Sequence, residues 1–424
     1  MAAKTQEIAK YCKLIMVTAE NNNKYYEMKE VNGQLQVTYG RVELTAVSKN
    51  YSMYEWDRLY RNKTGKGYKD VTHLVSVEVE DTPVVATIIK KNDGLDGIKD
   101  KVVKDFLTRM KSYTDTLVSK TYSVKADSVC KAQVDEAQSI IDKLVDLDPA
   151  KKAKQVNALL LDLYMTIPRY MSHTTNHLLP AIEKVYSATL LQEQDNLDAM
   201  ASQVHMIEKA KLKAKKEASK KKVVTKEPAK KTLLDTLGIT MEEGKVTKDI
   251  KYLVDQVGKA SGYRSSNVKI KGLLTIDQPS RNDIFNTWMK TQKDKSTRYL
   301  IHGTRCTSVI PIIETGLQIR PAGNFQFSGK AYGNGNYFSE VVDKSLGYAG
   351  YDTDKVLLVY EEHTGKPFVY SGWYRGNSFD LSYKELSKRG FDSTHVSAGN
   401  GLLNSEIIAY KEEQCTLRHI IWLT

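Results

Sequence analysis

The sequence has few cysteines, few prolines and no long apolar run. Its 424 residues include four cysteines and nine prolines, and the cysteines stand singly with no C-x-x-C pair. This spacing excludes the usual zinc fingers and predicts four free thiols in a reducing compartment. His173 and His177 form an H-x-x-x-H pair without a glutamate at the metalloprotease position, so we expect no metal.

Long hydrophobic stretches are also missing. No apolar run approaches the roughly 18 residues that a membrane helix needs. No apolar stretch follows the lysine near the N-terminus, so the sequence predicts neither a secretory signal nor a membrane protein.

Positive charge is abundant and concentrated in one segment. The net charge is +12, and residues 209–231 alone contribute +9 through eleven lysines and two glutamates. A segment of this composition cannot bury a core, so we expect a solvated helix extension or a flexible linker. DNA is the natural electrostatic partner. A nuclear import signal at Lys220–Lys222, an automodification region and a plain solvated linker are the alternatives.

A β-hairpin is predicted near the N-terminus. Asn32-Gly33 separates two strand-like runs, 25–31 and 34–41, and both central residues of a type I′ turn need positive φ. A helix-period stretch follows at 53–60. Within the second run, alternation directs one set of side chains to a common face: Leu35, Val37, Tyr39 and Arg41.

Helical periodicity dominates the middle of the chain. From Ile98 onward the apolar residues recur at helical spacing. Asp148-Pro149 predicts an N-cap with proline at the first helical position, and Ile167-Pro168 predicts the end of that helix. A further helical pattern runs from Pro180 toward Met206. These features predict a helical bundle.

Short strands and helices alternate from Thr232 onward, which predicts an α+β domain in which strands dominate. An apolar run beginning at Tyr299 ends in His302-Gly303. A glycine-rich turn at 333–335 precedes Tyr337-Phe338, and Glu406 opens a β-branched run near the end of the sequence.

Together these three features resemble the His–Tyr–Glu NAD⁺ site of poly(ADP-ribose) polymerases. The resemblance implies that Glu406 bonds the 2′-hydroxyl of the nicotinamide ribose, supports the developing positive charge and polarises the acceptor hydroxyl. His302 and Tyr337 complete the catalytic set that the resemblance implies. The implied contacts with NAD⁺, the co-substrate, come from His302, Gly303, Thr304, Tyr337, Ser345, Tyr348 and Arg320.

Two positions depart from the family pattern. Asn334 stands where many active polymerases carry lysine. Gln318 replaces an arginine that helps to hold the adenosine half of NAD⁺, and we expect Arg320 to compensate in part.

The rest of the chain resembles the DNA-dependent branch of the same family. The hairpin with Tyr39-Gly40-Arg41 is similar to the WGR domain, although tyrosine replaces the usual tryptophan, and this implies that Tyr39 and Arg41 contact DNA. The alternative is a small β domain whose Tyr39 packs in its core. Residues 161–168 resemble the regulatory helical domain, for which the alternative is a passive packing domain.

The resemblance implies four parts: a WGR-like DNA-sensing domain (1–90), an all-α regulatory domain (91–208), a lysine-rich linker (209–231) and a mainly-β α+β ADP-ribosyltransferase domain (232–424). The implied function is DNA-stimulated transfer of ADP-ribose to proteins, including itself, with elongation to poly(ADP-ribose) in the response to DNA strand breaks. A strictly mono-transferring enzyme and a catalytically dead DNA-end scaffold are the alternatives. We expect a nuclear location in a eukaryote, and otherwise a cytoplasmic, nucleoid-associated one.

Overall fold

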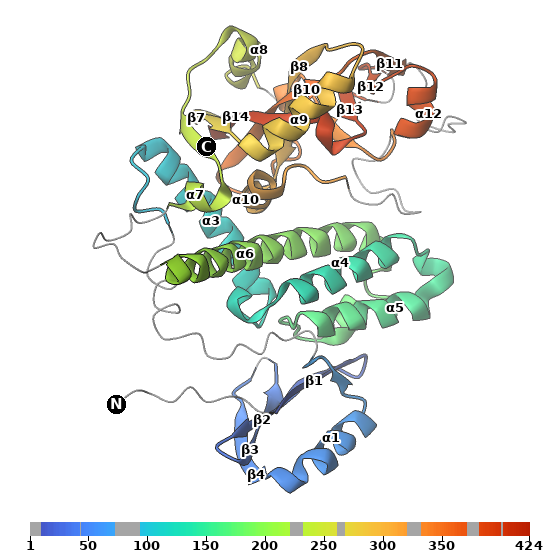
Figure 1. Cartoon of the computed structure of the whole chain (residues 1–424). Helices are drawn as coiled ribbons and strands as arrows, with labels where there is room; N and C mark the ends of the chain where they lie inside the picture. Colours follow the sequence, from blue (N-terminus) through green and yellow to red (C-terminus); the bar gives the residue numbers. More distant parts are fainter. Residues whose placement is uncertain are drawn as a thin grey trace. The chain divides into compact units, whose positions relative to one another are not determined.

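The computed structural model describes residues 10–42, 44–72, 94–220, 232–260, 268–319, 332–370, 381–399 and 402–424, without the side chains of 213–220. These residues divide into two compact units. The N-terminal unit comprises the described residues of Met1–Lys91 and Thr116–Val224, and the C-terminal unit those of Asn92–Asp115, Thr225–Ala322 and Gln326–Thr424. The chain therefore crosses between the units inside helix α3 (Lys101–Thr121) (Figure 1). The four-part division expected from the sequence remains a prediction.

An antiparallel sheet in the order β4-β3-β2-β1-β5 opens the N-terminal unit. The turn between β2 and β3 is Asn32-Gly33, with φ of 52° and 76°, so the predicted hairpin with two positive φ angles is confirmed. Leu35 and Val37 on one face of β3 are fully buried, as the alternation predicts. The elements are β1 (Tyr11–Thr18), β2 (Asn22–Val31), β3 (Gln34–Arg41), β4 (Val47–Ser52), η1 (Met53–Glu55), α1 (Trp56–Gly65) and β5 (Lys69–Asp70).

Helices make up the rest of this unit, and α4 (Lys131–Val145) packs against both α5 (Pro149–Thr166) and α6 (Tyr186–Lys220) (Figure 1). The carboxylate of Asp148 accepts a hydrogen bond from the amide of Ala150 at 3.0 Å, which confirms the predicted N-cap. Helix α5 ends at Thr166, before Ile167-Pro168, as predicted. Helix α6 begins at Tyr186, later than the sequence pattern suggests. The short helices are η3 (Ala126–Ser128), η4 (Thr174–His177) and η5 (Glu183–Val185).

A buried ion pair lies inside this unit. The guanidinium of Arg169 contacts the carboxylate of Glu193, and both side chains are almost fully buried. The ring centroid of Tyr164 lies 4.7 Å from the guanidinium carbon of Arg169. The carbonyl of Arg169 also accepts a hydrogen bond from the Asn23 amide group at 3.1 Å. These contacts join β2 to the segment that follows α5.

Two sheets form the C-terminal unit among the described residues, in the orders β6-β7-β14-β10-β8 and β11-β12-β13-β9. The second sheet contains the parallel pair β11–β12, and the other pairings are antiparallel. The arrangement is compatible with the predicted α+β class. The strands are β6 (Thr240–Glu243), β7 (Ile270–Asp277), β8 (Thr297–Thr304), β9 (Asn336–Phe338), β10 (Lys355–His363), β11 (Pro367–Tyr370), β12 (Ser393–Val396), β13 (Glu406–Ala409) and β14 (Cys415–Leu423).

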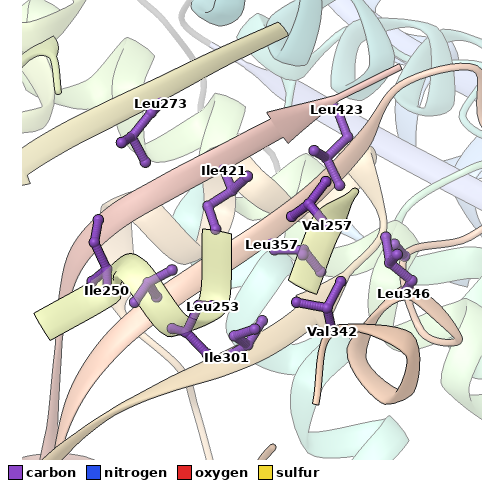
Figure 2. Close-up of a cluster of buried hydrophobic side chains, with 12 residues drawn as sticks. Ile250, Leu253, Val257, Leu273, Ile301, Val342, Leu346, Leu357, Ile421 and Leu423 are labelled. Atoms are coloured by element: carbon purple, nitrogen blue, oxygen red, sulfur yellow. The ribbon is translucent and has the colours of Figure 1, made fainter. Parts of the chain in front are cut away.

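Helices cover these sheets. Figure 2 shows α8 lying over the first sheet, with Ile250, Leu253 and Val257 directed toward Leu357 and Ile421. Val342 and Leu346 of α11 belong to the same apolar cluster, which fixes α11 beside β8. The helices are α7 (Leu233–Leu237), α8 (Lys248–Val257), α9 (Pro279–Thr291), α10 (Cys306–Thr315), α11 (Val342–Leu346), α12 (Tyr383–Lys388) and η6 (Glu412–Gln414).

The first half of α3 is anchored to the first sheet by the buried carboxylate of Asp354. One oxygen accepts hydrogen bonds from Arg109 Nε at 2.6 Å and from the Tyr113 hydroxyl at 2.9 Å, both on α3. The other oxygen accepts one from Trp422 Nε1 at 2.9 Å. Hydrogen bonds from these groups hold the pKa of Asp354 below its usual value, although burial opposes the shift.

Glu362 on β10 is a buried carboxyl group. It has no exposed surface, and neither of its carboxylate oxygens has a hydrogen-bond partner. Its neighbours across the sheet are Arg298 on β8 and Cys415 on β14. Burial raises the pKa of Glu362 to about 8 against the opposing charge of Arg298, so the folded protein holds this side chain protonated at neutral pH.

All four cysteines, Cys12, Cys130, Cys306 and Cys415, are free thiols, in agreement with the sequence prediction. Within the described part of the chain, no helix is long and apolar enough to cross a membrane.

Replacing Glu362 by glutamine should change how stability depends on pH. The folded-state pKa of about 8 lies above the ordinary value of 4.5, so the folded state binds the extra proton between these values. The wild-type free energy of unfolding should therefore fall by about 1.4 kcal/mol per pH unit from this group as pH rises through that window. Glu362→Gln should lose this slope. Urea denaturation at several pH values measures how the free energy of unfolding depends on pH, and Glu242→Gln, which changes an exposed residue, is the control. If stability depended on pH equally in the two variants, the raised pKa of Glu362 would be contradicted.

Replacing Asp354 by asparagine should destabilise the C-terminal unit by roughly 2–3 kcal/mol, because the amide removes the charge that Arg109 faces and mismatches at least one donor. Thermal unfolding of the full chain measures the loss. Asp283→Asn, on an exposed residue of α9, is the matched control and should change stability by less than about 0.5 kcal/mol. Comparable shifts in the two variants would argue against the anchor.

Candidate active site

The described candidate residues of the C-terminal unit come from four segments: the end of β8, the strand β9, the helix α11 with the turn after it, and the start of β13. Strand β9 pairs with β13, with Phe338 opposite Ile407, so the next positions along these strands are Ser339 and Glu406. Ser339 also pairs with Ile301 of β8 through two main-chain hydrogen bonds of 2.9 Å. Ser339 therefore lies between two segments: the strand that carries His302 is on one side, and the strand that begins with Glu406 is on the other.

His302 is held by the main chain of β9. A carbonyl can only accept a hydrogen bond, so the 3.0 Å contact with the carbonyl of Tyr337 assigns the proton to Nδ1 of His302. Burial lowers the pKa of His302, and the carbonyl contact opposes the shift. The imidazole is therefore neutral at physiological pH, with a lone pair on Nε2 that can accept a hydrogen bond from a hydroxyl.

Tyr337 uses its hydroxyl to close the glycine-rich turn. That hydroxyl donates to the carbonyl of Gly333 at 2.7 Å and accepts from the amide of Tyr332 at 2.9 Å. Gly333 has φ of +98°, which favours glycine. A Cβ on Gly335 would lie 2.4 Å from the carbonyl oxygen of Ala409. The turn therefore presents Tyr337 as predicted, and the phenol itself stabilises the turn.

Glu406 is the first residue of β13 and is almost fully buried. Its Oε1 lies 2.7 Å from the ammonium nitrogen of Lys344 on α11, and both side chains are largely shielded from solvent. Sequence reasoning missed Lys344. Lys344 directly precedes the candidate residue Ser345 in the sequence, and this position could have indicated a role for it in the site.

Gly303, Ser345 and Tyr348 lie together where β8 meets α11. A Cβ on Gly303 would lie 1.8 Å from the carbonyl oxygen of Ser345, so only glycine allows this approach of strand and helix. The hydroxyl of Ser345 donates to the carbonyl of Ile301 at 3.3 Å. Tyr348 is 47% exposed, which leaves much of its ring open to solvent. Its centroid is 6.0 Å from the nitrogen of Lys344.

The remaining candidates of this unit are less informative. Thr304 is buried at the end of β8, opposite Val356 of β10. Arg320 lies outside the described residues. Gln318 donates to the carbonyl of Thr315 at 3.1 Å, and the amide of the next residue, Ile319, donates to Glu412 at 2.8 Å.

Tyr39 and Arg41, the candidates for DNA contact, belong to the N-terminal unit. The ring of Tyr39 is partly exposed and lies 5.7 Å from that of Tyr26, so it packs at the edge of the core. The guanidinium of Arg41 donates to the carbonyl oxygen of Asn21 at 2.8 Å and to its side-chain oxygen at 3.2 Å.

The structure gives no indication of a metal centre in the residues it describes. None of their histidine, cysteine, aspartate and glutamate side chains form a group of three or more that could hold an ion.

Comparisons with known proteins identify the class. The model of the poly(ADP-ribose) polymerase catalytic domain matches residues 247–371, which include His302, Tyr337 and Tyr348, whereas Glu406 lies beyond the match. The chain is 49% identical over 179 residues to "Putative poly [ADP-ribose] polymerase-like 100L" of Invertebrate iridescent virus 6, covering 42% of this chain and 95% of that protein. It is 40% identical over 195 residues to "Uncharacterized protein 101L" of the same virus, covering 46% of this chain and 77% of that protein.

These matches identify an ADP-ribosyltransferase catalytic domain, a class that uses NAD⁺ as substrate. The chain belongs to the poly(ADP-ribose) polymerase family.

Replacing Gly303 by alanine should force β8 and α11 apart, because the new Cβ would overlap the carbonyl oxygen of Ser345. We expect a loss of about 3 kcal/mol in the free energy of unfolding. Thermal unfolding of the full-length variant and of the wild type measures this loss of stability. Gly258→Ala is the control, since a Cβ there meets open space and its backbone has a negative φ. Similar melting temperatures for the two variants would contradict the close approach.

Proposed function

We propose that this protein is a DNA-stimulated ADP-ribosyltransferase that attaches ADP-ribose from NAD⁺ to protein side chains, including its own, and elongates it to poly(ADP-ribose). The observation that carries the proposal is the bridge between Ile301 and Ser339, which joins the segments of His302 and Glu406, together with the ion pair of Glu406 with Lys344, in a chain that belongs to this family.

The proposed chemistry assigns a role to each group. The bond between nicotinamide and C1′ of the ribose breaks, and nicotinamide leaves with the electron pair. The ribose then carries positive charge, as in glycoside chemistry. Glu406 stabilises that charge, bonds the 2′-hydroxyl, and accepts the proton of the acceptor group whose oxygen forms the new bond to C1′. Lys344 orients the carboxylate through the 2.7 Å ion pair.

Other residues of the site are proposed to bind the ribose and the nicotinamide of NAD⁺. The neutral imidazole of His302 accepts a hydrogen bond from a ribose hydroxyl through Nε2. Gly303 lies on the edge of its sheet, where its main chain can bond the carboxamide of nicotinamide, and Ser345 completes that contact. The partly exposed ring of Tyr348 stacks on nicotinamide. Tyr337 lines the opposite side.

DNA stimulation is the second part of the proposal. The lysine-rich segment 209–231 provides electrostatic attraction to phosphates. In the N-terminal unit, the nitrogen of Lys63 lies 4.3 Å from the ring centroid of Tyr26 and 5.9 Å from that of Tyr39. Tyr26 is buried and Tyr39 is partly exposed, so this cation lies beside one accessible ring, an arrangement that suits the backbone and sugars of a DNA end. Release of the helical domain on DNA binding would then shift the protein toward its active state, in the nucleus or at the nucleoid.

A strictly mono-transferring enzyme is the second candidate. It is favoured by Asn334, which stands where many active polymerases carry lysine, and by Gln318, whose amide is bonded to the protein's own carbonyl oxygen at Thr315.

The deciding experiment incubates the purified full chain with NAD⁺, with and without nicked DNA, and follows the products by intact-mass spectrometry and by gel analysis with labelled NAD⁺. We expect added mass in multiples of ADP-ribose, increased by DNA, and a ladder of products. Single additions without a ladder would favour mono-transfer. No added mass in either condition would overturn the enzymatic proposal in favour of a DNA-end scaffold.

Replacing Glu406 by glutamine should leave NAD⁺ binding within about threefold while elongation falls by on the order of 10²-fold or more, the scale for loss of a charge-stabilising group. Labelled-NAD⁺ gels measure product length, and isothermal titration measures binding. The control, Glu413→Gln, changes an exposed carboxylate on η6 and should behave as wild type. Unchanged product length in Glu406→Gln would exclude the proposed role.

A further inference from the structure

We propose that Ser339 is a positioning residue for Glu406: its hydroxyl fixes the start of β13 to the start of α11 and thereby sets the carboxylate in its reactive place. This inference rests on the proposed function and adds to it a residue outside the His302, Tyr337 and Glu406 set.

The main chain of Ser339 already connects the two sheets. Its amide donates to the carbonyl of Ile301, and its carbonyl accepts from the amide of Ile301, both at 2.9 Å. The side chain is 2% exposed, so its hydroxyl must find partners inside the protein.

The hydroxyl has two main-chain partners from different segments. It donates to the carbonyl of Ser405 at 3.0 Å, one residue before Glu406. It accepts from the amide of Val341 at 3.0 Å, one residue before α11. A single buried oxygen therefore joins the backbone beside the carboxylate of Glu406 to the backbone that leads to Lys344.

Helix α11 has further supports that do not depend on Ser339. Gln256 of α8 donates to the carbonyl of Glu340 at 2.9 Å and accepts from the amide of Val342 at 3.1 Å. Val342 and Leu346 are buried in the apolar cluster of Figure 2. Loss of the hydroxyl should therefore loosen the Ser405–Glu406 end more than the helix.

Alanine at position 339 isolates this side-chain role. The two main-chain hydrogen bonds with Ile301 remain, so the approach of β8 to β9 that seats His302 is retained. The carbonyl of Ser405 loses its donor, and Glu406 becomes free to move relative to Lys344. The expected signature is a change in kcat with little change in KM for NAD⁺.

The experiment compares Ser339→Ala with Ser393→Ala in the full chain. Ser393, on β12 of the same unit, is fully buried and donates to the carbonyl of Thr364 at 2.7 Å, so its variant also removes a buried hydroxyl bonded to a carbonyl. We expect similar losses of melting temperature. Ser339→Ala should lose about tenfold in kcat with KM for NAD⁺ within about threefold, whereas Ser393→Ala should keep kcat within about twofold.

Hydrogen exchange provides a readout that does not need turnover. Peptides covering 340–346 and 402–409 should exchange faster in Ser339→Ala than in wild type, with the larger change in 402–409, and should be unchanged in Ser393→Ala. Equal kcat values for the two variants, or unchanged exchange in 402–409, would overturn the inference while leaving the proposed function intact. Absence of turnover in the wild type would overturn the proposed function, and exchange would still decide the role of Ser339.

Discussion

The main-chain pairing of Ile301 with Ser339 is the constraint on which the candidate site depends. The two sheets of the C-terminal unit have separate strand orders, and this pair of hydrogen bonds connects β8 of one with the end of β9 in the other. His302 follows one partner directly, and Glu406 lies beside the other on β13. Because side chains on neighbouring strand positions have fixed directions, the bridge sets where imidazole and carboxylate are placed.

Local structure could be predicted where local chemistry decides it. Asn32-Gly33 specifies a turn with two positive φ angles, and the structure has both. Asp148-Pro149 and Ile167-Pro168 mark the ends of α5 because a capping carboxylate and a proline act within a few residues. The helical pattern from Pro180 predicts too early a start for α6, because the residues after Pro180 form a turn and a short 3₁₀ helix before Tyr186.

The residues of the candidate site could be proposed from the sequence, but the contacts among them could not. His302, Gly303, Tyr337 and Glu406 stand in recognisable sequence settings, whereas Lys344 and Ser339 become relevant only once strands distant in sequence are paired. Strand register depends on which residues of β9 and β13 face one another, and no local pattern specifies that choice. The hydrogen bond from the Tyr337 hydroxyl to the carbonyl of Gly333 could not be predicted either, because it depends on how the turn between them folds. Burial of Glu362 also emerges only from the assembled sheets.

The hydrogen bond between Arg109 and Asp354 spans 245 positions of sequence. Because residues of α3 up to Asp115 belong with the C-terminal unit, the portion of the N-terminal unit from Thr116 to Val224 is an insertion between two pieces of its partner unit. No single cut in the gene would then separate one unit from the other. A protein that carried only the residues after Val224 would lack the α3 segment whose Arg109 and Tyr113 donate to the buried carboxylate of Asp354.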